Sequence, residues 1–466
     1  MKKFDDQLVS GSILRSVWKL TWPAATLNLV NGIHGLVDHI LIGHYLASPD
    51  NAANAAIGVA WQVFLVIVVF IASLFHGMNV LIARYAGKQD RVSMSRAAFE
   101  SFLSAVIILV FFLAPVGYFI APYLLDLVRA HEDVRLLALP YLRLLFVCGA
   151  PLFLMFMFTG AFQASGDPKT PLFLGILTTI LNVCISVVLI TGVGPFPAMG
   201  IMGAALGTVL APAVSVAISM VLILRKKMIL HPPEKFHLLP DLSVMKTVVR
   251  IGIPTGIQGV LLNIGGVLLF RFLGSLGEEL SASAQAAYTI CYAQLFSIIT
   301  WTCFGLRSAA GTIMGQNIGA GDPHRGIRGV QVAASFGAVW ALLIGTLFWF
   351  FPADLLAVFG AVDGTIVEVG VSLLRFLSFS GIVLAITLAL TGGLQGAGET
   401  KMPMYIAFLT QIVLLLGICG FLDWRGQLTP DRVWMAIFIS HLGRLILTLL
   451  VFRTDKWAHR KIELGS

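Results

Sequence analysis

The sequence predicts an all-α integral membrane protein whose twelve transmembrane helices form two pseudo-symmetric six-helix bundles. Three observations predict this fold: an apolar composition, a series of long apolar stretches, and an internal repeat. Of the 466 residues, 58% are hydrophobic and only 12% are charged, whereas soluble domains carry about 25% charged residues. Together with a mean hydropathy of +0.91, this composition excludes a soluble globular protein.

Apolar stretches long enough to cross a bilayer occur along the whole chain. A hydrocarbon core about 30 Å thick takes roughly 20 residues of helix. The predicted helices occupy residues 17–41, 55–83, 97–119, 136–162, 171–191, 199–224, 248–272, 283–309, 327–350, 368–392, 403–422 and 432–452. The polar segment 225–247, which contains prolines and a basic cluster, is predicted to be a cytoplasmic linker. It separates a first lobe, residues 1–224, from a second lobe, residues 248–466.

The basic residues predict the orientation in the membrane. Most of the 31 Lys and Arg residues lie near the termini and in the loops that follow even-numbered helices, whereas the opposite loops hold Arg129, Arg135, Arg271, Arg425 and Arg432. Because short cytoplasmic loops are enriched in Lys and Arg, both termini are predicted to be cytoplasmic. The same loops account for the net charge of +8, so no nucleic-acid partner is expected.

An internal repeat relates the two lobes. The segment FQASGDPKTP (162–171) reappears as LQGAGETKMP (394–403), and Asp90 and Gly149 match Asp322 and Gly381 at the same offset. Pro23 matches Pro254 at an offset one residue shorter. Because six helices separate the copies, both lobes insert with the same orientation. Parallel repeats of this kind are typical of transporters that bind their cargo between the halves.

Sequence motifs for catalysis are not found. The Gly-rich segments fit neither GxxxxGK[ST] nor GxGxxG in a βαβ unit, and HGLVDH (34–39) has the wrong spacing for a zinc protease. The Gly-rich segments are instead predicted to be tight turns in which Gly adopts positive φ and an acidic residue caps the next helix. The five cysteines lie within apolar runs without metal-type spacing. We therefore expect no enzyme activity, no resident cofactor and no metal centre.

Ionisable and polar residues inside the spans remain as candidates, because each costs about 2.5–3.5 kcal/mol at the bilayer centre and usually faces a cavity. Asn31, His34 and Asp38 follow at steps of three and four, so they share one face of the first helix. Asn31 and His34 are expected to line the substrate cavity. Asp38 is interpreted either as a solvated carboxylate at the helix mouth or as a carboxylate that binds H⁺ or Na⁺. In the second case desolvation would raise its pKa towards neutral pH.

Further polar residues occur in both lobes. Asn182 and Ser186 lie one turn apart in the fifth helix, and Thr208 lies among small residues of the sixth. Each is interpreted either as forming an interhelical hydrogen bond or, together with Asp38, as supplying an oxygen ligand for a small hard cation. In the second lobe, an expected substrate-cavity wall that suits a cationic amphiphile contains Gln258, Asn263, Gln285, Tyr288 and Tyr292, although Tyr near a span end is equally an interfacial anchor. Arg143, Arg307 and Arg375 are interpreted as snorkelling anchors.

The sequence resembles the multidrug and toxic compound extrusion (MATE) family over nearly its whole length. The resemblance rests on GLVDHILIGHYL (35–46), on SAAGTIMGQNIGAGDPHRG (308–326) and on the paired turns after the fourth and tenth helices. It implies a twelve-helix antiporter with the MATE/MOP-type fold, which exports organic, often cationic, compounds in exchange for H⁺ or Na⁺.

The resemblance also implies a coupling site in the first lobe. Asp38, Asn182 and Thr208 match the family's first-helix Asp, fifth-helix Asn and sixth-helix Thr, and these three are the possible Na⁺ ligands. Ser186 stands where these family members have a second Asp. The second lobe lacks acidic residues at depth in its seventh and tenth helices, so the chain resembles the DinF-like branch more than the NorM-like branch.

Three functions are considered. The first is a multidrug exporter, a monomer in the lipid bilayer of a bacterial inner membrane, with small amphiphilic molecules as substrates. The second is a flippase for a lipid-linked or amphipathic precursor, which would require several Lys or Arg residues around a cavity to hold a diphosphate. The third is a membrane receptor or an intramembrane enzyme, which would require a soluble module or a catalytic constellation. The first accounts best for the sequence.

Overall fold

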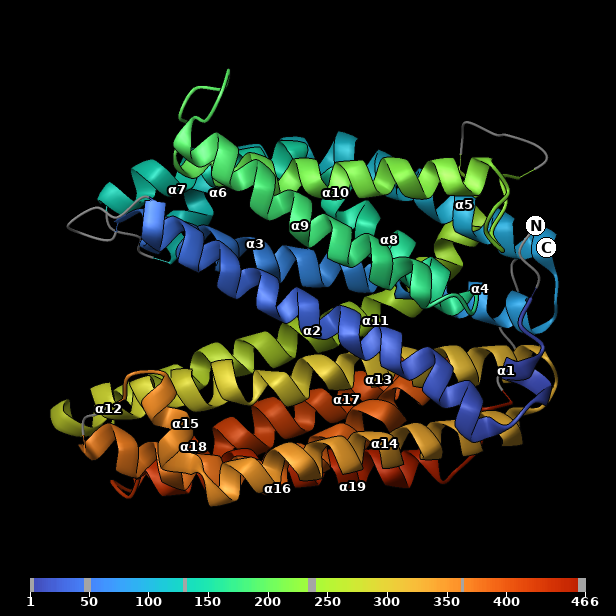
Figure 1. The fold of residues 1–466 in the computed structure, drawn as a ribbon. Helices are drawn as coiled ribbons and strands as arrows, with labels where there is room; N and C mark the ends of the chain where they lie inside the picture. Colours follow the sequence, from blue (N-terminus) through green and yellow to red (C-terminus); the bar gives the residue numbers. More distant parts are fainter. Residues whose placement is uncertain (1–3, 46–51, 129–131, 234–239, 362–363, 460–466) are drawn as a thin grey trace. The chain divides into compact units, whose positions relative to one another are not determined.

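The fold is given by a computed structural model that describes residues 4–45, 52–128, 132–233, 240–361 and 364–459 (Figure 1). Within these ranges, the side chains of residues 33–45 and 52–55, and of residues 65, 66, 72, 74, 127, 278 and 279, lie outside the description. The described residues form helices joined by short loops, and no strand occurs among them. The prediction of an all-α fold is confirmed.

The long helices coincide with the predicted spans. Ten helices in the described part of the chain are long and apolar enough to cross a membrane: Ala56–Gly87, Arg91–Asp126, Lys169–Thr191, Ile201–Leu224, Leu242–Gly274, Leu280–Gly319, Pro323–Phe350, Gly364–Gly396, Lys401–Trp424 and Pro430–Phe452. An eleventh is formed by Glu132–Cys148 and Ala150–Ala164, which meet at a bend of 51°. The first predicted span is occupied by α2 (Ile13–Tyr45), a helix of 33 residues.

The chain divides into two compact units. The N-unit is built on Leu29–Ile253, and the C-unit on Asp6–Asn28 together with Pro254–Ile462. This division differs from the predicted lobes, because residues 6–28 belong to the C-unit and residues 225–253 to the N-unit. The helices α2 and α11 (Leu242–Gly274) each contribute their first part to one unit and their remainder to the other.

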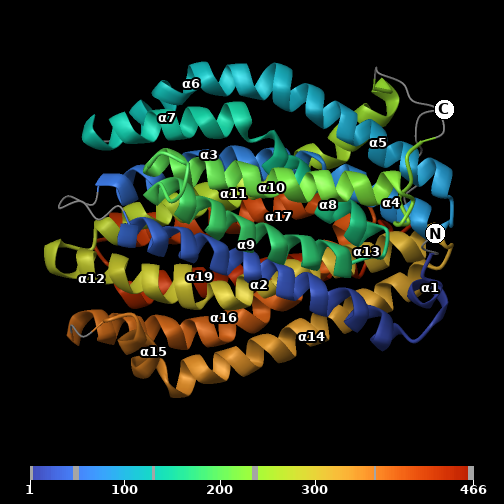
Figure 2. The same ribbon diagram turned by 45° about the horizontal axis from the view of Figure 1, so that its top comes forward.

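The N-unit contains the helices that follow the first span. They are α3 (Ala52–Leu74), α4 (His76–Gly87), α5 (Arg91–Ile107), the π-helical η1 (Ile108–Leu113), α6 (Ala114–Leu127), α7 (Glu132–Cys148), α8 (Ala150–Ala164), α9 (Lys169–Thr191) and α10 (Ile201–Leu224). Figure 2 shows α5 and α6 as one continuous rod, with α7 alongside α6. Large buried rings such as Phe64, Phe158 and Phe162 fill the spaces between these helices.

The C-unit contains α1 (Gln7–Ser10), α12 (Glu278–Tyr288), the π-helical η2 (Thr289–Leu295), α13 (Ser297–Gly319), α14 (Pro323–Phe350), α15 (Pro352–Val358), α16 (Gly364–Gly396), α17 (Lys401–Ala407), the π-helical η3 (Phe408–Leu416), α18 (Gly417–Trp424) and α19 (Pro430–Phe452). The helix α16 packs against α13, α14 and α19. The core of the C-unit includes the buried side chains of Phe296, Phe348 and Trp434.

The repeated turns have the same geometry in both units. Gly166 and Gly398 adopt φ values of 92° and 84°, which favour Gly because it has no Cβ. The acidic residue that follows each Gly accepts bonds from the first turn of the next helix: the Asp167 carboxylate accepts from the Thr170 N–H at 3.4 Å and from the Thr170 hydroxyl at 2.7 Å. The Glu399 carboxylate accepts from the Lys401 and Met402 N–H groups at 3.1 and 3.2 Å. The prediction of capped tight turns is confirmed.

One pair of repeat-related helices differs. The 33-residue helix α16 is continuous, whereas its counterpart is broken into α7 and α8 with a bend of 51°. Pro151 follows the break, and at the matching position of α16 the chain has Val383. Because Pro has no N–H, it cannot donate to the carbonyl one turn earlier, and a helix bends there.

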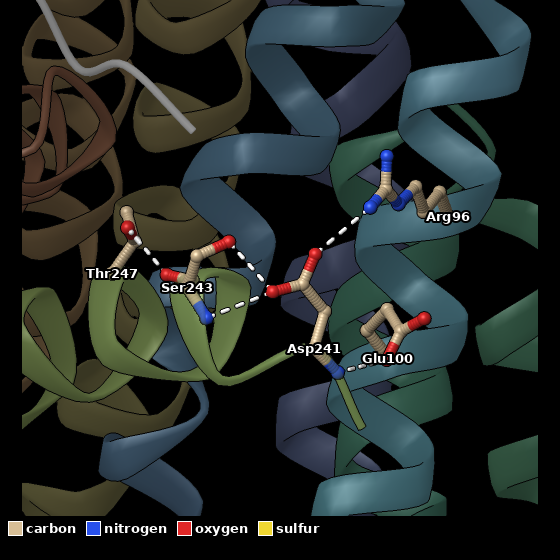
Figure 3. Close-up of polar contacts among 5 residues, drawn as sticks. All are labelled: Arg96, Glu100, Asp241, Ser243 and Thr247. Carbon is tan, nitrogen blue, oxygen red and sulfur yellow. Dashed lines mark hydrogen bonds and ion pairs between the residues drawn. The ribbon is translucent and has the colours of Figure 1, made fainter. Parts of the chain in front are cut away.

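The segment that follows α10 docks onto α5. Met228, Ile229 and Leu230 are buried, and the His231 N–H donates to Ser95 Oγ at 3.1 Å. At the other end of the segment, the Asp241 N–H donates to Glu100 Oε2 at 2.7 Å, and Arg96 Nη2 donates to Asp241 Oδ2 at 2.8 Å (Figure 3). The part of the predicted linker that the structure describes is therefore fixed to the N-unit at both ends.

Two titratable groups of this segment have shifted pKa values. Two bonds from Ser243, its N–H at 2.8 Å and its hydroxyl at 2.7 Å, lower the pKa of Asp241 (Figure 3). Asp241 thereby caps α11 in its charged form. Partial burial, and then the positive charge of Arg91, lower the pKa of His231. Because a guanidinium only donates, His231 Nε2 accepts from Arg91 at 3.4 Å, so the imidazole is held neutral.

Candidate functional site

The predicted ligands of the fifth and sixth helices lie on the packed pair α9 and α10. Asn182, Ser186 and Thr208 expose 1%, 2% and 7% of their surface. Asn182 and Ser186 follow one turn apart on α9, as the spacing requires. Thr208 lies on α10 and donates to the Ala204 carbonyl at 3.0 Å.

Small residues on α10 allow the two helices to approach closely. A Cβ atom placed on Gly207 would lie 2.1 Å from Ser186 Oγ, and one placed on Gly203 would lie 2.6 Å from the Leu189 carbonyl carbon. Only Gly permits contacts of this kind, which are common between helices in membranes. Ser186 is thereby brought against the residue that precedes Thr208.

Three polar atoms of this site have no hydrogen-bond partner among the described residues. They are Asn182 Nδ2, Asn182 Oδ1 and Ser186 Oγ. An unsatisfied buried polar group costs about 1–3 kcal/mol, so such groups in a native structure call for a ligand or water. Amide and hydroxyl oxygens are the donors that a small hard cation prefers.

The remaining predicted residues of the first lobe lie on α2. The helix is continuous to Tyr45, and the shared face of Asn31, His34 and Asp38 stays a prediction. Asn31 is half-buried. The side chains of His34 and Asp38 lie outside the described residues, so the role of Asp38 stays a prediction. No group of three or more His, Cys, Asp or Glu residues suited to a metal occurs in the described part of the chain.

In the C-unit, Gln258 belongs to a buried polar chain that links three helices. Gln395 Nε2 on α16 donates to Gln258 Oε1 on α11 at 2.8 Å. Gln395 Oε1 accepts from Arg307 on α13, through Nε at 3.0 Å and Nη2 at 2.7 Å. The interpretation of Arg307 as a snorkelling anchor is wrong, because its guanidinium is bonded to a fully buried amide. Gln395 could have been identified from the sequence as a candidate, because Gln395 lies within the repeated segment 394–403.

Two other predicted cavity residues make local contacts. Asn263 Nδ2 donates to the Gly259 carbonyl of its own helix at 2.9 Å. Gln285 is half-buried and faces Gly274, where a Cβ atom would lie 3.3 Å from Gln285 Nε2. Neither residue joins the chain of Gln258, so the structure separates these three predicted positions.

Tyr288 and Tyr292 belong to an aromatic column between the eighth and twelfth predicted helices. Their rings stack at 4.9 Å with an interplanar angle of 9°. Tyr288 also stacks on Trp434 at 6.2 Å, Tyr292 contacts Phe296 at 5.2 Å, and Phe296 stacks on His441 at 6.4 Å. Tyr288 is only 5% exposed, which is the position of a core residue and not of an interfacial anchor.

Arg444 is a functional candidate that the sequence analysis missed. Its Nε donates to Thr410 Oγ1 at 3.1 Å and its Nη2 to Gln411 Oε1 at 2.6 Å. Both acceptors lie on the π-helical η3, and π-helical segments are frequent at functional sites. The spacing of His441 and Arg444, one turn apart in an apolar span, is the signal that could have found this cluster.

Comparisons with known proteins now decide the family. The family model described as MatE matches the chain twice, over residues 23–188 and 254–419, and so covers more than half of it. The chain belongs to the MatE family. The two matches confirm the internal repeat, and they begin at Pro23 and Pro254, the positions that the sequence analysis paired.

Relatives of this MatE chain extend over almost its whole length. A probable multidrug resistance protein NorM of Thermotoga maritima is 25% identical over 97% of this chain and 94% of the relative. A probable multidrug resistance protein YpnP of Bacillus subtilis is 24% identical over 99% of both chains. A multidrug resistance MATE family transporter solved in an outward-facing conformation has the same fold, with a TM-score of 0.87, 19% identity and 98% coverage of each chain.

These comparisons confirm the MATE/MOP-type fold and the general class. MatE proteins are membrane transporters and not enzymes. The chain is a multi-pass membrane protein, and its bacterial relatives indicate the plasma membrane. The assignment to the DinF-like branch, and each predicted site residue, stay predictions.

Proposed function

We propose that this chain is a secondary active exporter, which moves small amphiphilic compounds out of a bacterial cell in exchange for H⁺ or Na⁺ by alternating access. The relatives named as multidrug resistance proteins support the cargo class. The proposal includes the inner membrane as location, cytoplasmic termini, a monomer, and no cofactor other than the coupling ion.

The unpartnered polar atoms of Asn182 and Ser186 are the observation that carries the proposal. They lie in a lipid-embedded helix pair that has no need of them for packing, because small residues already bring α9 and α10 together. In the proposed mechanism, Asp38 takes up H⁺, or Asp38, Asn182 and Thr208 bind Na⁺ with Ser186 beside them. Antiport requires that the ion and the cargo favour opposite states, so their binding must be negatively linked.

Efflux from proteoliposomes tests the proposal. Purified protein is reconstituted, loaded with ethidium, and placed in turn under an imposed pH gradient and an imposed Na⁺ gradient. We expect one gradient to drive efflux, and Asp38→Asn and Asn182→Ala to abolish the driven component. The matched control is Thr179→Ala, because the Thr179 hydroxyl donates to the Gly175 carbonyl of the same helix. Gradient-driven efflux at the wild-type rate in both site variants would remove this site from the mechanism.

Ser186→Asp tests the identity of the ion. The substitution places a second carboxylate beside Asn182, where the family pattern has one. Because carboxylates are hard oxygen ligands, we expect it to increase the dependence of efflux on Na⁺. An unchanged ratio of Na⁺-driven to H⁺-driven efflux would show that position 186 does not contact the ion.

A further inference from the structure

Arg444 lies deep within a membrane-spanning helix. The helix α19 has 23 residues, and at about 1.5 Å per residue Arg444 is about 21 Å from its first residue. An arginine at such depth is costly and is normally compensated by a partner. Its side chain is only partly exposed, so the surrounding protein must supply most of this compensation.

The partners of Arg444 are neutral. Thr410 and Gln411 accept its two hydrogen bonds through a hydroxyl and an amide oxygen. No carboxylate whose side chain the structure describes forms an ion pair or hydrogen bond with it. A guanidinium has five N–H donors, so the positive charge is solvated in part but not neutralised within the described C-unit.

The groups around Arg444 form an aromatic wall with a free polar atom. His441, one turn before Arg444, is 5% exposed, and its Nδ1 has no hydrogen-bond partner among the described residues. Its ring ends the column formed by Trp434, Tyr288, Tyr292 and Phe296. The phenol of Tyr292 also interacts electrostatically with the positive charge of Arg444. An aromatic ring and a charged donor are therefore placed side by side.

The repeat shows that this charge is specific to the C-unit. Thr178 is the counterpart of Thr410 in the repeat, and in the N-unit its hydroxyl lies 2.6 Å from Ser215 Oγ. Counted from the first residue of their helices, Ser215 of α10 and Arg444 of α19 hold the same position. In the N-unit two hydroxyls make this contact between α9 and α10, whereas in the C-unit Arg444 contacts the Thr410 hydroxyl. The N-unit therefore shows that such a helix pair can pack without a cation at this position.

We propose that the C-unit binds an oxyanion, such as the carboxylate of an aromatic amphiphile, at Arg444, with the rings of Tyr292 and His441 against its apolar part. The proposal deepens the proposed export function, on which its biological role rests, because it names anionic and zwitterionic aromatic compounds as cargo. An anionic lipid headgroup has the same chemistry and is the other source of such an oxyanion.

Three probes with one aromatic body test the charge preference without any variant. Pyrenebutyrate, pyrenebutanol and pyrenebutylammonium are titrated into wild-type protein in nanodiscs of zwitterionic lipid, and binding is followed by energy transfer from tryptophan to pyrene. Empty nanodiscs correct for partition into lipid. We expect pyrenebutyrate to bind most tightly and the ammonium probe most weakly. Binding of the ammonium probe as tight as that of pyrenebutyrate would overturn the proposal.

Variants then assign the preference to one residue. A hydrogen bond to a charged group contributes about 1.5–3 kcal/mol. Arg444→Gln should therefore weaken the binding of pyrenebutyrate about ten- to a hundredfold and leave the affinity for pyrenebutanol nearly unchanged. Arg444→Lys keeps the positive charge, so it should weaken the binding of pyrenebutyrate by less. Arg375→Gln is the control, because Arg375 is a span arginine over the Trp349 ring. Equal weakening of all three probes by Arg444→Gln would show a packing defect and reject the site.

The source of the oxyanion is tested by lipid composition. If anionic lipid is the natural occupant, phosphatidylglycerol in the nanodiscs should compete with pyrenebutyrate and weaken its binding to the wild-type protein. The binding of pyrenebutyrate to Arg444→Gln should not change with this lipid. Unchanged affinity assigns the site to a soluble cargo. These measurements are made without a gradient, so a failure of ion-coupled export and a failure of the Arg444 site give different results.

Discussion

Gly207 offers a direct measure of how closely α9 and α10 meet at the candidate ion site. A Cβ atom added there would lie 2.1 Å from Ser186 Oγ and 3.2 Å from the Cβ and backbone N of Ser186. Overpacking of this kind costs about 1–3 kcal/mol, whereas replacing Gly by Ala within a helix regains about 1 kcal/mol. We therefore expect Gly207→Ala to lower the free energy of unfolding by about 0–2 kcal/mol.

A double-mutant cycle isolates the contact. Ser186→Ala removes the atom at 2.1 Å, so in that background Gly207→Ala should be neutral or stabilising, with a coupling energy of about 1–2 kcal/mol. Gly203→Ala is the matched control, because its Cβ would lie 2.6–2.7 Å from backbone atoms of Leu189 and Ile190. Its cost should not depend on residue 186. A Cβ at Gly266 meets no described atom within 4 Å, and Gly266→Ala should be stabilising.

The assay is unfolding by SDS titration of the purified protein in mixed micelles, followed by tryptophan fluorescence and circular dichroism. We expect coupling between positions 207 and 186 and none between positions 203 and 186. If Ser186→Ala leaves the cost of Gly207→Ala unchanged, then Ser186 does not occupy the space above Gly207. The close approach of α9 and α10 at the candidate ion site would then be rejected.

Three further predictions concern polar contacts. Gln395→Ala leaves Arg307 and Gln258 without their partner and should lower the free energy of unfolding by about 2–4 kcal/mol in the same SDS titration. Gln395→Glu keeps an acceptor for Arg307, so it should lower the free energy of unfolding by less. The pKa of His231 is lowered in the folded state, so its contribution to docking onto α5 is complete above its ordinary value near 6.5 and is lost as pH falls below that value. Hydrogen exchange of residues 228–231, corrected for intrinsic rates, should therefore accelerate from pH 7.5 to pH 5.5, and His231→Gln should remove this dependence. Asp241→Ala removes the cap of α11 and should raise exchange at residues 242–245, whereas Arg96→Gln should change it little, because Arg96 is 62% exposed and surface ion pairs contribute little.

The helices and the repeat could be predicted from the sequence because both depend on local or periodic signals. Each apolar stretch appears as a helix or, for residues 136–162, as the bent pair α7 and α8. The turns at Gly166 and Gly398 follow from the residues they contain. The division into units could not be predicted in the same way. Residues 6–28 and 225–253 were assigned by their place along the chain, whereas the units depend on tertiary contacts such as the bonds of Asp241 to α5.

The candidate site was predictable only in part, for a physical reason. Asn182 and Ser186 were found because one helical turn separates them, and their burial follows from Gly203 and Gly207 on the facing helix. Arg307 and Arg444 were missed or misinterpreted, because an isolated arginine in an apolar run gives the same pattern whether it snorkels or is buried. Their partners lie more than 30 residues away, at Gln395 and at Thr410 and Gln411.

Ion coupling through the N-unit is tested most directly by the release of the coupling ion when cargo binds to the purified transporter. The protein is loaded with H⁺ or ²²Na⁺ in detergent, a substrate that supports efflux is added, and the released ion is measured. Negative linkage predicts release from the wild-type protein and none from Asp38→Asn or Asn182→Ala. Cargo binding that releases neither ion, and whose affinity does not change with pH or Na⁺ concentration, would contradict a coupling site in the N-unit.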